Sequence, residues 1–403
     1  MEKRIYARWF RRALLLLVAC VIPFSGVSAA DRKEIRIGAV NSMTGWLAMG
    51  GVPEKWGYEQ AIADINKKGG IFVKELGKKL PVRLIFVDDK STPDGGAAGT
   101  EKLIKMDKVD CILGSDDSSI NIAVATIVQK YKVFMMQGMF PERFEIEKYK
   151  WVDNYFFSAL GASEVPFKIW NQLPEADKIK RPVLMTEDNQ DGQAFGDGFR
   201  MSAKKYGYEF VVDAPYGVGS KDFSSHILKM KAAKADALLF FGGATDGITL
   251  LRQIKDQQLK LRYIHGWRGF WPTEFLKAMG SDTDYIIHDG FWAENNGVPG
   301  SKEVGQRFTK QFGQDSVTAG YYYACAQILA QAIEKAGSAD SAKIRDLVFS
   351  GNFAGKNIMG DFKFNEKGMF NTECLALQWW KGERMPVWPP LPNVWKVKMI
   401  PVQ

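Results

Sequence analysis

Short apolar runs that fit buried strands alternate with stretches of helical hydrophobic periodicity in the first part of the chain. Gly69 and Gly70 end the first helical stretch, and Pro93 opens the second. This alternation is typical of a parallel sheet with helices on both faces. The expected strands are 35–40, 82–87, 111–113 and 133–136, and the expected helices are 56–65, 93–105 and 120–129.

The same alternation restarts after about residue 160 and predicts a second lobe similar to the first. Here the expected strands are 183–185, 210–212, 237–241, 263–264 and 285–292, and the expected helices are 195–206, 223–231 and 248–255. Residues 301–350 are predicted to be almost entirely helical, and 352–381 to form strands and turns. The chain is rich in proline from Met385 onward, and we expect this tail to run extended over the surface.

Composition fits a folded, two-domain protein. The chain has 403 residues, of which 46% are hydrophobic and 25% charged, and this excludes a disordered, collagen-like or coiled-coil chain. Much of the formal net charge of +8 comes from Lys and Arg in the first dozen residues. The rest of the chain has no Lys/Arg run of the kind that binds phosphate backbones, so we expect no nucleic acid partner.

The N-terminus has the features of an export signal. Residues 1–12 are basic, the apolar run at 13–21 is too short for a lasting membrane anchor, and 28–30 are the small residues that a signal peptidase needs. We therefore expect 1–30 to be a signal peptide and the protein to be periplasmic. Two alternatives stay open at this point, a lipoprotein anchored through Cys20 and a retained helix.

Catalytic motifs are missing from the sequence. Cys111, Cys325 and Cys374 are too far apart for a disulfide framework or a metal site, and we expect Cys111 and Cys325 to be buried and reduced. The three histidines have no metal-ligand spacing, and phosphate-loop, dinucleotide and nucleophile-elbow motifs are absent. We expect no enzyme, no catalytic residue, no metal and no cofactor. An exported two-lobed α/β protein of this kind is most simply a binding protein.

Several short motifs occur in one order along the chain. They are an opening strand at 35–38 with a "TG" loop at 43–45, a helix at 57–70, "DD" at 88–89, 112–114 with "SS" at 118–119, 195–198, "KDFS" at 221–224 and "GG" at 242–243. In this order they resemble the type I periplasmic solute-binding proteins of the branched-chain amino acid (Leu/Ile/Val-binding) ABC transporter family. The resemblance covers nearly all of residues 35–380.

The resemblance implies an architecture. It is an α/β fold of two Rossmann-like lobes with parallel sheets, joined by three hinge crossings near 154–160, 290–296 and 356–364. One lobe would hold 31–156 plus 296–356, and the other 157–295 plus 357–403. The ligand would bind between them, outside the carboxyl ends of the strands.

The resemblance also implies a function. The chain would be the extracytoplasmic solute-binding subunit of an ABC importer, capturing a small polar or carboxylate-bearing solute, amino acid-like or an aromatic acid, and delivering it to a membrane permease. The alternative is a ligand-sensing module that presents a solute to a membrane receptor. Membrane contact is expected only through the permease or through a lipid anchor at Cys20.

The family's ligand loops correspond to defined positions in this sequence. Ser118 and Ser119 lie at a helix start, where hydroxyls and backbone N–H groups suit an anion; the alternative is simple helix capping. Trp46 would form an aromatic wall of the site, or pack on a lobe surface. The further positions that match the family's ligand contacts are Gly138, Met139, Phe140, Phe195, Ala244 and Thr245.

Arg268 is the main departure from the family pattern. When the sequence is matched to the family's motifs, Arg268 replaces the acidic residue that pairs with a ligand's α-ammonium. An arginine there favours a carboxylate or carbonyl of the ligand instead. The alternative is that Arg268 points outward or pairs with an acid of the protein such as Asp116, Asp117 or Asp191.

Overall fold

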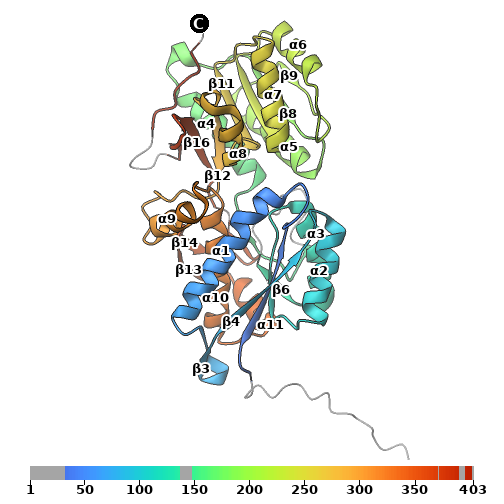
Figure 1. The fold of residues 1–403 in the computed structure, drawn as a ribbon, viewed down its shortest axis with the longest axis vertical. Helices are drawn as coiled ribbons and strands as arrows, with labels where there is room; N and C mark the ends of the chain where they lie inside the picture. Colours follow the sequence, from blue (N-terminus) through green and yellow to red (C-terminus); the bar gives the residue numbers. More distant parts are fainter. Residues whose placement is uncertain (1–31, 137–147, 371, 390–394, 402–403) are drawn as a thin grey trace, which may run out of the picture. The chain divides into compact units, whose positions relative to one another are not determined.

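The computed structural model describes residues 32–136, 148–370, 372–389 and 395–401. The described residues from 34 onward form one compact unit. It is built on two separate sheets whose strands are mostly parallel, with helices packed on their faces (Figure 1). This confirms the predicted α/β class with two sheets.

The first sheet has the strand order β4-β1-β5-β6, and every pair in it is parallel. Its strands are β1 Ile35–Asn41, β4 Val82–Asp88, β5 Cys111–Leu113 and β6 Phe134–Met136. Helices α1 (Ala48–Lys67) and α10 (Ala319–Ala336) pack together beside it, and α2 (Pro93–Lys105) packs with α3 (Ser118–Tyr131) on the other side (Figure 1). Because β1 lies between β4 and β5, the connections from neighbouring strands diverge at their carboxyl ends, which leaves a crevice there.

The second sheet has the order β17-β16-β12-β11-β10-β8-β9. The strands from β9 to β12 are parallel, and β16 and β17 add an antiparallel edge. Here the strand order reverses between β8 and β10, which again places a crevice at the carboxyl ends. The strands are β8 Pro182–Thr186, β9 Val212–Asp213, β10 Ala237–Gly242, β11 Tyr263–Arg268, β12 Ile287–Gly290, β16 Leu375–Trp380 and β17 Glu383–Trp388. The helices that accompany them are α4 Ala159–Gln172, α5 Gln190–Tyr206, α6 Ser224–Ala232, α7 Ala244–Asp256 and α8 Thr273–Met279.

The remaining elements are short strands and two helices. They are β2 Ile71–Val73, β3 Lys78–Leu80, β7 Asn154–Tyr155, α9 Ser301–Phe312, α11 Ser341–Val348, β13 Ala354–Asn357, β14 Gly360–Lys363 and β15 Met369–Phe370. The lobe boundary predicted between 356 and 357 falls within the β13–β14 hairpin, and β15 pairs with β7. The boundaries of the lobes stay a prediction.

Helices α3, α5 and α7 begin earlier than their apolar periodicity predicts. Asp117 caps α3 by accepting hydrogen bonds from the N–H groups of Ser119 and Ile120, and Asn189 caps α5 in the same way. The residues of these first turns are polar or small, so hydrophobic periodicity does not detect the turns. The N-cap of α3 is therefore Asp117, the residue before the two serines for which capping was the alternative.

The expectation for the proline-rich tail was wrong in part. Residues 383–388 form the edge strand β17 rather than a surface segment outside the sheet. Pro386 is tolerated there because an edge strand leaves backbone N–H groups without a ladder partner. Residues 390–394 lie outside the described part of the chain.

Cys111, Cys325 and Cys374 are buried and unbridged, as expected for the first two. Within the described residues, no helix combines the length and the apolar character needed to cross a membrane.

Candidate functional site

Two chambers adjoin at the carboxyl ends of both sheets. The inner chamber holds about 30 Å³ and is mostly aromatic; its lining residues are Ser118, Phe156, Phe157, Ala159, Asp191, Phe195, Phe241, Arg268, Trp271, Asp289 and Phe291. The outer chamber holds about 440 Å³, enough for a small organic molecule. Arg268, Trp271 and Phe291 line both chambers and so lie between them.

Loops from both sheets build the outer chamber. Trp46 and Asp116 follow strands of the first sheet, whereas Glu187 and Thr245 follow strands of the second. A solute in this chamber would therefore contact both sheets at the positions where each strand order reverses.

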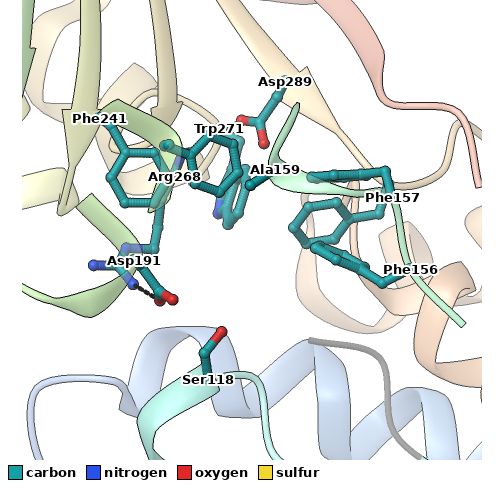
Figure 2. Close-up of a pocket in the computed structure, with 11 residues that line it drawn as sticks. Ser118, Phe156, Phe157, Ala159, Asp191, Phe241, Arg268, Trp271 and Asp289 are labelled. Carbon is teal, nitrogen blue, oxygen red and sulfur yellow. Dashed lines mark hydrogen bonds and ion pairs between the residues drawn. The ribbon is translucent and has the colours of Figure 1, made fainter. Parts of the chain in front are cut away.

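Arg268 is held by carboxylates of the protein. It forms an ion pair with Glu187, its Nη1 lies 3.4 Å from Asp191 Oδ2, and the same nitrogen lies 4.0 Å from Asp117 Oδ2. Figure 2 shows Arg268 and Asp191 paired on one side of the inner chamber, with Ser118 opposite. The side chain of Arg268 is 12% exposed and that of Glu187 is 1% exposed, so the pair is largely shielded from water.

Aromatic faces also hold the guanidinium. Its Cζ lies 5.4 Å from the ring centre of Phe241 and 5.7 Å from that of Trp46, distances at which a cation is attracted to a ring face. Phe195 stacks on Phe241 with ring centres 4.3 Å apart and fixes its position. The alternative that Arg268 pairs with acids of the protein is thus the arrangement in this structure, and the guanidinium does not point freely into the cavity.

Burial shifts the acids of the site toward their neutral forms. Desolvation, with repulsion from Asp117 and Asp89, raises the pKa of Asp116 to about 8 although Arg268 opposes the shift. Desolvation and the charge of Asp117 raise the pKa of Asp191 to about 7. The pKa of Asp289 is also raised well above its usual value by burial.

The start of α3 is occupied by the protein itself. Asp117 accepts the N–H groups of Ser119 and Ile120, and its carboxylate also receives the hydroxyl of Ser119. Ser118 lines the inner chamber, but Ser119 does not line either chamber. The cap of α3 is therefore Asp117 and neither serine, and the N–H groups expected to attract an anion already donate to the carboxylate of Asp117.

The structure brings most of the predicted site residues together. Ser118 and Phe195 line the inner chamber; Trp46, Ala244 and Thr245 line the outer one; and Arg268 lines both. Trp46 is 57% exposed at the outer chamber and is not packed into a lobe surface. Gly138, Met139 and Phe140 lie outside the described residues. Whether these residues contact a solute stays a prediction.

Several lining residues were not predicted from the sequence. Phe156, Phe157 and Trp271 form much of the inner chamber, and Glu187 brings an acidic group to the outer one. Glu187 directly follows the buried strand β8, a position at a carboxyl end that could have been recognised. The aromatic pair at 156–157 gave no signal, because adjacent aromatics also suit an ordinary core.

Comparisons with known proteins agree with this geometry. A family model described as "Periplasmic binding protein" matches residues 34–384. The "Leu/Ile/Val-binding protein homolog 2" of Brucella abortus (strain 2308) is 24% identical over 368 residues, which cover 91% of this chain and 95% of that protein.

Two solved structures show the same fold. LivJ from Streptococcus pneumoniae, in complex with isoleucine, has a TM-score of 0.77 at 21% identity and covers 87% of this chain and 98% of its own. A solute-binding protein from Rhodopseudomonas palustris BisB5, in complex with 3,4-dihydroxy benzoic acid, has a TM-score of 0.73 at 20% identity, with 88% and 95% covered. Both likenesses confirm the two-lobed fold of the type I binding proteins.

Proteins of this family bind solutes and are not enzymes, and the relatives' names connect them with branched-chain amino acid transport. The match of the family model over most of the sequence, together with the two-lobed fold, confirms the resemblance seen in the sequence motifs. The chain therefore belongs to the periplasmic binding protein family.

Proposed function

We propose that this protein is the solute-binding subunit of an ABC importer, capturing a small polar solute in the outer chamber and delivering it to a membrane permease. In this proposal it acts in the periplasm and leaves the solute chemically unchanged. Residues 1–30, which we infer to be its signal peptide, lie outside the described residues, and so does Cys20.

One observation carries the proposal. A cavity of about 440 Å³ lies at the carboxyl ends of both sheets and takes its walls from both. Pockets for small molecules commonly enclose about 300–1,000 Å³ and lie at such switch points. A solute there would hold the two lobes together, because each lobe supplies part of its surroundings.

A carboxylate-bearing solute, amino acid-like or an aromatic acid, is the finer expectation from the sequence. Such a solute would have to replace Glu187 or Asp191 as the partner of Arg268. Because both protein carboxylates are largely buried, this exchange would leave one of them without its counter-charge. A screen for the solute should therefore include carboxylate-bearing compounds as one class among several.

A screen of purified protein tests the function. A library of amino acids, amines, amides and small acids is added, and the melting temperature is recorded, since a ligand specific for the folded state raises it. Compounds that raise it are titrated by calorimetry, and we expect one site per chain and no product. If nothing in the library binds, the proposal is wrong.

A pair of variants places the site. Thr245 is exposed at the outer chamber, so Thr245→Trp would fill the chamber without disturbing the core. Thr249 lies one turn further along α7, outside both chambers, and Thr249→Trp serves as the control. We expect binding to be lost only in Thr245→Trp. Equal affinities in the two variants would place the solute elsewhere.

A further inference from the structure

The described residues that line the two chambers carry an excess of acid. Their carboxyl groups belong to Asp116, Glu187, Asp191, Asp246, Glu274, Asp289 and Asp315, and their basic groups to Arg268 and Arg384. Both guanidinium groups are already paired within the protein, Arg268 with Glu187 and Asp191, and Arg384 with Asp315. The lining therefore carries seven carboxyl groups against two guanidinium groups, and each guanidinium already has a carboxylate partner.

Two of these carboxylates have a buried oxygen that no group of the described chain satisfies. They are Asp116, through Oδ1, and Glu187, through Oε2. Glu187 is 1% exposed, and its other oxygen pairs with Arg268. Both residues line the outer chamber, and they come from different sheets. A buried oxygen left without a hydrogen-bond donor costs about 1–3 kcal/mol, so a donor supplied by a ligand would be favoured here.

We propose that the solute is recognised through a positively charged amine, whose N–H groups donate to Asp116 and Glu187 in the outer chamber while its apolar body packs against Trp46, Trp271 and Phe291. This inference rests on the proposed function and names the class of solute. An ammonium has several donors, so one such group can donate to more than one carboxylate.

The position of Arg268 supports this choice. It shows that the cleft already holds one cation between carboxylates and aromatic faces. The two features that the sequence offered to an anion, Arg268 and the start of α3, are both bound by carboxylates of the protein. The aromatic residues of the outer chamber add to the attraction, because ring faces favour a cation over an anion.

Binding of the amine should be coupled to loss of the proton on Asp116. Asp116 faces Asp117 and Asp89 on its own sheet, Glu54 and Tyr58 on α1, Tyr322 on α10, and Arg268 across the cleft. With a pKa of about 8, Asp116 is largely protonated at pH 7, and an ammonium beside it would favour the ionised form. Binding of an amine is therefore expected to release protons and to tighten as the pH rises from 6 to 8.

The test uses two pairs of probes, each with one apolar body and opposite charge. They are phenethylamine with hydrocinnamate, and isoamylamine with isocaproate. We expect at least one amine to bind at least tenfold more tightly than its carboxylate partner, and to release protons at pH 7 in titrations run in buffers of different ionisation enthalpy. Carboxylates that bind as well as the amines, or the failure of both amines, would overturn the inference. A hit from another class would leave the proposed function standing, whereas no hit in the whole library would remove both.

Matched variants separate recognition from overall charge. Asp116→Asn keeps the shape of the side chain and resembles its protonated form, and we expect it to weaken amine binding at least tenfold. Glu274→Gln makes the same carboxyl-to-amide change in the wall of the same chamber, and we expect less than a threefold effect. Equal losses in the two variants would show that Asp116 makes no direct contact. Glu187→Gln is compared with Glu274→Gln in the same way, and we expect it too to weaken amine binding at least tenfold. Circular dichroism checks that this variant is folded.

Discussion

Replacing Arg268 by methionine should reveal how strongly the cleft depends on its central cation. Methionine keeps an unbranched chain of similar reach but cannot pair with an acid. In the variant, the carboxyl groups of Glu187 and Asp191 would lose their cation in surroundings where their side chains are 1% and 10% exposed. Removing one partner from a buried ion pair costs about 3–5 kcal/mol, because the other charge is left uncompensated. We expect a loss of that size at pH 7.

Urea denaturation of wild-type and Arg268→Met protein, followed by circular dichroism, measures this loss. The pKa of Asp191 in the folded state is already raised to about 7, and loss of the guanidinium, which opposes this shift, would raise it further. Stability is then lost as pH rises through the folded pKa and regained on acidification, so the difference from wild type should shrink between pH 7 and pH 5. The variant Arg268→Met with Glu187→Gln should recover part of the loss. A single variant within about 1 kcal/mol of wild type at pH 7 would refute the reasoning.

Three further predictions concern stability alone. Asp116 has a folded pKa raised to about 8, so the ligand-free protein should lose stability between pH 5 and pH 8, by up to about 1.4 kcal/mol per pH unit, and Asp116→Asn should flatten a melting-temperature profile over that range. Asp117→Ala should cost about 1 kcal/mol in urea denaturation through loss of the α3 cap, with Asp117→Asn close to wild type. Gly242→Ala should cost about 1–3 kcal/mol because its Cβ would lie 1.7 Å from the Tyr216 hydroxyl, whereas Gly243→Ala has nothing within 4 Å; equal effects of the two would contradict this packing.

Most strands of the two large sheets were predictable because each is a short apolar run flanked by polar residues. The observed β1 Ile35–Asn41 and β10 Ala237–Gly242 each differ by one residue from the expected ranges. Helix starts were less predictable, because residues such as Asp117 and Asn189 act through backbone hydrogen bonds and not through periodicity. Strand β17 was missed because its proline suggested a loop, although an edge strand accepts proline.

The site was predictable in position but not in its charge balance. Trp46, Ser118 and Thr245 follow strands or begin helices, so local patterns located them. The partner of Arg268 could not be found in this way, because Glu187 lies 81 residues earlier in the sequence and meets Arg268 only through the order of strands in the sheet. A single sequence gives no measure of such pairings.

The central claim is that a solute is held between two lobes, each supplying part of its surroundings, so that binding should draw the lobes together. Spin labels at Lys130 on α3 and Lys255 on α7 provide a direct test, because both side chains are well exposed, at 63% and 65%, and belong to different sheets. The cysteines within the described residues are buried, so cysteines introduced at these two positions would take up the label. Pulsed electron paramagnetic resonance should show a shorter and narrower distance distribution after the solute found in the screen is added. A distribution that stays the same with the solute bound would contradict the account.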